Sequence, residues 1–110
     1  MEKQTKVTNE LLKTVPIQQA FLFYTDIGEY TGIYADNLNN FHKKIDTIPL
    51  ASIDFHFKRG DFVKWVRDTL GDEQLAVKIN SVKTSITPRK MKTSLKRTVK
   101  RRLNQLNKNQ

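Results

Sequence analysis

Charge is divided unevenly along this chain. The last 28 of its 110 residues, 83–110, contain ten Lys or Arg and no Asp or Glu. All eleven acidic residues lie before position 74, where they balance the ten basic residues found up to position 78. The net charge of +9 is therefore −1 for residues 1–82 and +10 for the remainder. A block of one sign repels itself unless an anionic partner neutralises it, and we expect nucleic acid first and a membrane surface second.

The apolar residues of this basic segment recur at spacings of four and three, which predicts an amphipathic helix of about five turns. Thr87 and Pro88 would begin it, as the capping residue and the first helical residue. No Glu is present within it to form a stabilising pair one turn away. The narrow apolar stripe that would lie on the rest of the protein consists of Met91, Leu95, Val99, Leu103 and Leu106.

Length and composition predict one domain. A chain of 110 residues is too short for two independent cores. We expect a polar segment at 1–15, a compact body at 16–82 and the basic helix at 83–110, packed on the body or extending from it.

The absence of cysteine excludes disulfides and thiolate chemistry. Because no apolar run approaches membrane-spanning length and no secretory leader is recognisable, we expect a cytoplasmic protein.

The body is predicted to begin with a β-hairpin. A short helix starting at Thr8 or Asn9 would end before Pro16. Residues 20–24 are dense in aromatics and too short for a buried helix, so they predict a strand, and 32–34 would return beside it.

Several short helices should follow the hairpin. Asp36, Asp61 and Asp72 are each placed to cap one of them. Segment 50–58 fits both a strand and a helix, and we favour a helix because its neighbours are helical. The predicted class is therefore α+β, mostly helical, with a short N-terminal β-hairpin, several short helices and a long basic C-terminal helix.

A fairly specific pattern runs from Phe55 and His56 to Trp65. With more generic residues around it, the chain resembles a mostly archaeal family of small domains of unknown function, over roughly 17–106. The resemblance implies one compact domain of archaeal origin, and it assigns no activity to the chain. The residues that carry it are Phe23, Tyr24, Gly28, Thr31, Gly32, Ser52, Ile53, Phe55, His56, Arg59, Asp61, Phe62, Trp65, Gly71, Asp72, Leu75, Ala76, Arg102 and Leu106.

His56 is the one imidazole near other polar side chains, including Arg59 and Asp61. A histidine beside a carboxylate can serve as a general base, but the sequence offers no accompanying nucleophile, metal ligands or phosphate-binding loop. We favour a structural histidine, bonded to backbone and supporting the turn before Asp61. His42 reads as a solvated helix residue, and Trp65 as a core residue.

Three tyrosines in the hairpin allow two interpretations. Tyr24, Tyr30 and Tyr34 could stack on unpaired bases, but we favour packing against helices.

The preferred hypothesis is a non-enzymatic, cytoplasmic RNA-binding protein without cofactor or metal, associated with the ribosome and contacting rRNA phosphates and neighbouring ribosomal proteins. The alternative is a protein-interaction or regulatory module that docks on an acidic protein surface. A basic face that is merely solvated also stays open. A membrane role is disfavoured because the apolar stripe offers no Trp or Phe. The expected RNA-binding residues are Arg89, Lys90, Lys92, Lys96, Arg97, Lys100, Arg101 and Arg102.

Overall fold

The alternation of aromatic residues in the first strand directs one face of a hairpin toward the helices. The computed structural model describes residues 10–108. In it, β1 (Phe21–Asp26) pairs antiparallel with β2 (Glu29–Ala35). Phe21 and Phe23 are buried, whereas Leu22 between them is exposed. Gly28 closes the two-residue turn at φ +77°, a conformation that favours glycine.

Short helices cover the buried face of the hairpin, which confirms the α+β, mostly helical class. Segment 50–58, ambiguous in sequence, is helical as predicted. The elements are η1 (Ile17–Gln19), which precedes β1, then α2 (Leu38–Ile45), α3 (Leu50–Arg59), α4 (Asp61–Lys64), the π-helical turn η2 (Trp65–Thr69) and α5 (Glu73–Asn80).

Two of the three predicted caps are wrong. Asn37, not Asp36, caps α2, because Asn37 is the extended residue directly before the helix and its side chain accepts the Asn40 N–H at 2.7 Å. Asp61 is the first residue of α4 after Gly60, and its carboxylate turns back toward α3 instead of capping. The cap at Asp72 is confirmed, since its carboxylate accepts the Leu75 N–H at 3.0 Å. The helix start predicted at Thr8 or Asn9 lies outside the described residues.

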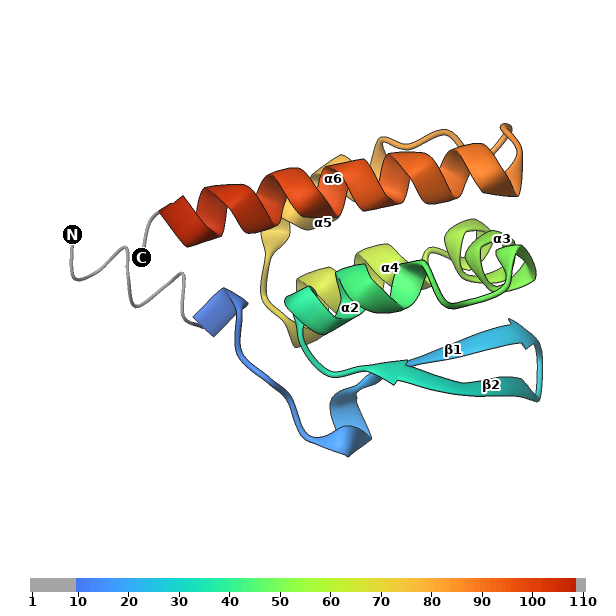
Figure 1. Cartoon of the computed structure of the whole chain (residues 1–110), viewed down its shortest axis with the longest axis horizontal. Helices are drawn as coiled ribbons and strands as arrows, with labels where there is room; N and C mark the ends of the chain where they lie inside the picture. Colours follow the sequence, from blue (N-terminus) through green and yellow to red (C-terminus); the bar gives the residue numbers. More distant parts are fainter. Residues whose placement is uncertain (1–9, 109–110) are drawn as a thin grey trace.

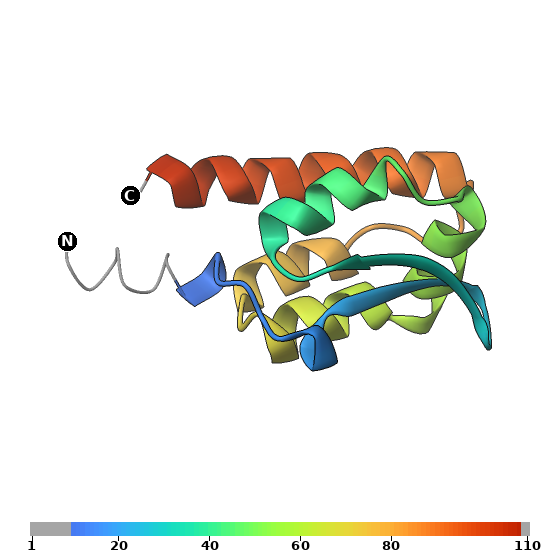
Figure 2. The same ribbon diagram turned by 60° about the horizontal axis from the view of Figure 1, so that its bottom comes forward.

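The basic segment forms α6 (Pro88–Lys108), the longest helix. As predicted, the Thr87 hydroxyl accepts the Lys90 N–H at the start of the helix, at 3.3 Å. All five residues of the predicted apolar stripe are buried, none more than 4% exposed. Helix α6 contacts α2, α3 and α5. It therefore lies across the helical layer on the side opposite the hairpin (Figures 1 and 2).

Aromatic rings fill the space between the hairpin and the helices. Trp65 is 7% exposed, packs against the rings of Phe21 and Phe41, and donates its indole N–H to the Gln19 carbonyl at 2.8 Å. Trp65 is thus a core residue, as predicted.

Within residues 10–108 no helix combines the length and apolarity needed to cross a bilayer.

Candidate nucleic-acid interface

The outer face of α6 carries cations that point away from the protein. The apolar stripe faces inward, so the opposite side of the helix is left to solvent. Six exposed cations lie on this side of α6, and none of them has an ion-pair partner within residues 10–108. The exposed cations are Arg89, Lys90, Arg97, Lys100, Arg101 and Lys108.

The flank of α6 that faces α2 is partly neutralised. The Asp46 carboxylate at the end of α2 lies 2.7 Å from Lys96 Nζ and 3.9 Å from Lys92 Nζ. The hydrogen bond from Lys96, together with the nearby charges, lowers the pKa of Asp46. These exposed pairs are weak, so both lysines keep part of their charge available to a polyanion.

His42 lies on α2 beside the same cations and is half-buried. Burial lowers its pKa, and the charges of Lys100 and Lys96 lower it further. The predicted place of His42 on a helix is confirmed, but its side chain is only partly solvated. A phosphate placed against these lysines would have the opposite effect on His42, because it would offset their charge.

Arg102, on the flank facing α5, has a different environment from the other predicted residues. Its guanidinium donates to the Asp72 carboxylate at 2.8 Å, to Gln74 at 2.9 Å and to Gln105 at 3.1 Å. The side chains of Arg102 and Asp72 are 11% and 1% exposed. Since Asp72 also caps α5, this pair ties α6 to α5 and contributes little to the outer face.

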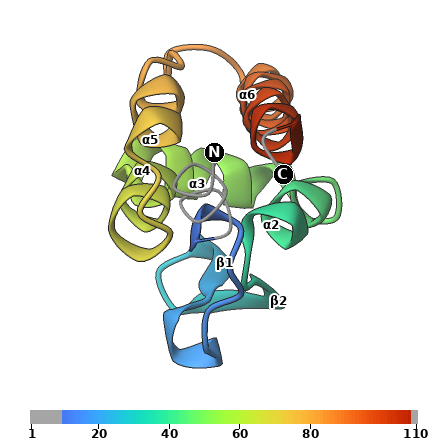
Figure 3. The same cartoon turned by 90° about the vertical axis from the view of Figure 1, so that its left-hand side faces the viewer.

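A groove of about 510 Å³ lies between the end of α5 and the second half of α6. Lys78 and Ser81 line it from the α5 side, and Thr98, Arg101, Asn104 and Lys108 line it from α6. Viewed along α6, the two helices that supply the walls stand side by side at one end of the molecule (Figure 3). The residues that line this groove include four cations and no acid.

The structure places the eight residues predicted to bind RNA in different environments. Of the eight residues predicted to bind RNA, Arg89, Lys90, Arg97, Lys100 and Arg101 share the exposed face, whereas Lys92 and Lys96 pair with Asp46. The predicted set did not include Lys78 and Lys108, which line the groove. Lys108 lies seven residues after Arg101, about two helical turns, and therefore on the same face of α6. The sequence pattern could have indicated it. The pattern could not have indicated Lys78, because nothing local to α5 shows that this lysine faces α6.

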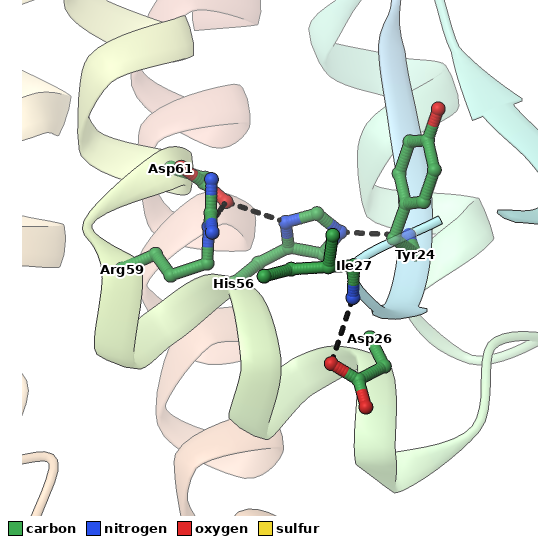
Figure 4. A network of polar contacts seen from close by, with 6 residues as sticks. All are labelled: Tyr24, Asp26, Ile27, His56, Arg59 and Asp61. Atoms are coloured by element: carbon green, nitrogen blue, oxygen red, sulfur yellow. Dashed lines mark hydrogen bonds and ion pairs between the residues drawn. The ribbon is translucent and has the colours of Figure 1, made fainter. Parts of the chain in front are cut away.

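The histidine cluster forms a second polar site, beneath the hairpin (Figure 4). The backbone N–H of Tyr24 donates to Nε2 of His56 at 2.8 Å, so Nε2 is unprotonated and Nδ1 carries the hydrogen. Nδ1 donates to Asp61 Oδ2 at 2.9 Å, and Arg59 Nε donates to the same oxygen at 3.1 Å. The predicted structural role of His56 is confirmed: it is bonded to backbone and supports the turn at Asp61.

Burial dominates the titration of His56. It lowers the pKa of the imidazole, while the hydrogen bond and charge of Asp61 oppose this and Arg59 adds to it. A pocket of about 440 Å³ adjoins the ring, lined mostly by apolar atoms of Phe21, Phe55 and Ile27. Because both ring nitrogens are already engaged, His56 offers no available lone pair to a ligand in that pocket.

The predicted packing of the tyrosines against helices is wrong for two of them. Tyr30 and Tyr34 are 44% and 40% exposed. The register pairs Leu22 with Tyr34 and Tyr24 with Tyr30. This pairing places Tyr30 and Tyr34 on the open face of the sheet. Tyr24 is half-buried, and its ring lies 5.3 Å from that of Tyr30 and 6.4 Å from that of His56 on α3.

Within residues 10–108 no three His, Cys, Asp or Glu side chains are grouped as metal ligands would be.

No protein-family model matches the chain, and neither does any curated protein or any solved structure. The resemblance to an archaeal family of small domains therefore stays a prediction.

Proposed function

We propose that this protein binds structured RNA through the phosphate backbone, using the outer face of α6. The observation that carries the proposal is the row of exposed, acid-free cations on a helix whose other side is anchored in the core. A helix of 21 residues is about 30 Å long. Such a rigid row can meet several phosphates at once with little loss of backbone freedom on binding.

Affinity in this mechanism comes from counterion release, and it is weakly selective for sequence. Lys and Arg side chains that contact phosphates displace condensed counterions but do not read base edges. The mixture of flexible lysines and forked arginine guanidiniums suits an irregular array of phosphates. A small domain with a nearly neutral body and one cationic helix is a common design among ribosomal proteins, so we propose ribosome-associated rRNA as the target.

Purification at two salt concentrations tests the proposal. RNA should copurify with the protein at low salt, giving a high ratio of absorbance at 260 nm to that at 280 nm, and should be removed at high salt. In a sucrose gradient of lysate, the tagged protein should sediment with a ribosomal subunit. Protein free of nucleic acid at low salt, running only at the top of the gradient, would contradict the proposal.

A protein-interaction role is the second candidate, and the open face of the hairpin favours it. Leu22, Tyr30 and Tyr34 expose apolar and aromatic surface there, on the side of the molecule away from α6. Aromatic residues are enriched at protein interfaces. In this reading α6 docks on an acidic protein surface and the hairpin adds contact area. The same low-salt purification would then yield a stoichiometric protein partner that nuclease treatment leaves bound.

A further inference from the structure

We infer that the groove between α5 and α6 is a subsite of the RNA interface that seats one backbone phosphate and the ribose next to it. This inference rests on the proposed function. It adds to that function a residue of the body, Lys78, and a chemical preference for RNA over DNA.

The groove is bordered by positive charge. Lys78 approaches from α5, and Arg101 and Lys108 approach from α6, so three cations from two elements border one concave space. The charge of Arg102, the fourth cation, is matched by Asp72. The other three have no ion-pair partner within residues 10–108. A concave surface of one sign concentrates its field and attracts an anion more strongly than a convex helix face does.

The neutral residues of the groove can form hydrogen bonds with a sugar hydroxyl. Ser81, Thr98 and Asn104 lie among the cations, and their side chains can both donate and accept hydrogen bonds. A ribose 2′-hydroxyl also donates and accepts, and it is the group by which proteins distinguish RNA from DNA. The volume of about 510 Å³ is within the range of ligand pockets and is ample for a phosphate with its sugar.

Hydrogen bonds within the protein hold the walls of the groove in place. The wall formed by Arg102 is held by hydrogen bonds to Asp72, Gln74 and Gln105, and the Ser81 hydroxyl donates to the Lys78 carbonyl at 2.7 Å. The groove is thus formed before any ligand arrives. RNA would order only the ends of the Lys78, Arg101 and Lys108 side chains, which keeps the entropic cost of binding low.

The test compares two single substitutions in exposed helical lysines. K78Q removes the groove cation of α5, and K64Q removes an exposed cation of α4 that lies outside the groove. Affinity is measured by fluorescence anisotropy with a labelled RNA stem-loop, over a range of salt concentrations. K78Q should weaken binding roughly 3- to 10-fold at low salt and make the slope of log K against log salt shallower by about 1. K64Q should change affinity less than about 2-fold. Equal effects of K78Q and K64Q would overturn the inference.

The ribose is tested with T98V, which keeps the shape of the side chain and removes its hydroxyl. T98V should weaken binding to RNA but leave binding to a DNA stem-loop of the same sequence unchanged, so the preference for RNA falls. An unchanged preference would overturn the ribose half of the inference. Wild-type protein that binds neither nucleic acid would refute the proposed function itself. Binding that depends on Arg97 and Lys100 but not on Lys78 would refute the groove alone.

Discussion

His56, on α3, bonds to the hairpin through the Tyr24 backbone and to the start of α4 through Asp61, and the bond to Tyr24 requires a neutral ring. Its Nε2 accepts from the Tyr24 backbone, and protonation would place a hydrogen where that N–H already points. Burial of the ring lowers the pKa of His56, and the charge of Arg59 adds to this effect, whereas Asp61 opposes it. The histidine is therefore a pH-sensitive part of the fold.

Acidification below about pH 6.5 should destabilise the protein. The pKa of His56 is lower in the folded state than the ordinary value of about 6.5 that it has when unfolded, so the unfolded state takes up the proton first. The free energy of unfolding should fall as the pH drops below about 6.5, measured by urea denaturation at each pH. The pKa of His42 is also lowered, so it contributes in the same direction. H56Q should flatten the dependence more than H42Q does, and a profile unaffected by H56Q would contradict this account of the ring.

Arg101 and Arg102 are neighbours in sequence with opposite roles. R102Q leaves the buried Asp72 carboxylate without its cation and should destabilise the fold by about 3 kcal/mol. R101Q removes an exposed charge and should leave stability within about 0.5 kcal/mol.

RNA binding should be more sensitive to R101Q than to R102Q. Under conditions where both variants are folded, R101Q should reduce RNA affinity and the salt slope, and R102Q should change the slope little. Chemical denaturation and anisotropy measure the two effects. Similar stability losses in both variants would show that the Asp72 pair does not anchor α6.

At the scale of the elements, α6 is part of the core. Leu95 is fully buried against the body, and L95D should cost roughly 2–4 kcal/mol through lost packing and an unpaired buried charge. T93D adds the same charge on the exposed side of the same helix and is the matched control. An L95D variant as stable as T93D would mean that α6 is an independent arm.

Local sequence patterns identify the elements because their causes are local. The spacing from Met91 to Leu106 defines a helix face, and Thr87 and Asp72 are caps that the structure confirms. The caps at Asp36 and Asp61 failed because another residue or another bond competes for the same atoms: Asn37 reaches Asn40, and Asp61 reaches His56. Such competition depends on backbone geometry that residue type alone does not reveal.

Tertiary pairing limits what sequence could predict of the candidate site. The exposed cations of α6 follow from its apolar stripe. The neutralisation of Lys96 by Asp46 and of Arg102 by Asp72 joins residues 50 and 30 positions apart. The approach of Lys78 to the same groove likewise depends on how α5 lies beside α6. The exposure of Tyr30 and Tyr34 depends on the register of a hairpin whose ends were only approximately predicted.

The whole molecule has two different surfaces, with α6 on one side of the helical layer and the hairpin on the other (Figure 3). Among residues 10–108, α6 carries most of the exposed cations without ion-pair partners, whereas the hairpin bears Asp26 and Glu29 near its turn. A polyanion approaching this protein is attracted to one side and repelled from the other, which orients the encounter.

The salt dependence of RNA binding tests the central claim most directly. If α6 meets about five phosphates, log K for the wild type should fall with log salt at a slope of roughly −3 to −5.

Changing Lys90, Arg97, Lys100 and Arg101 to Gln removes four outer charges while keeping helix propensity and the apolar stripe. The variant should bind about 10²-fold more weakly at moderate salt, with a much shallower slope and a melting temperature equal to or above that of the wild type. The control changes Lys13, Lys43, Lys58 and Lys64, four exposed cations outside α6 and its groove, and should lose far less. A wild-type slope near −1, or loss of binding in the control while the α6 variant still binds, would contradict the account.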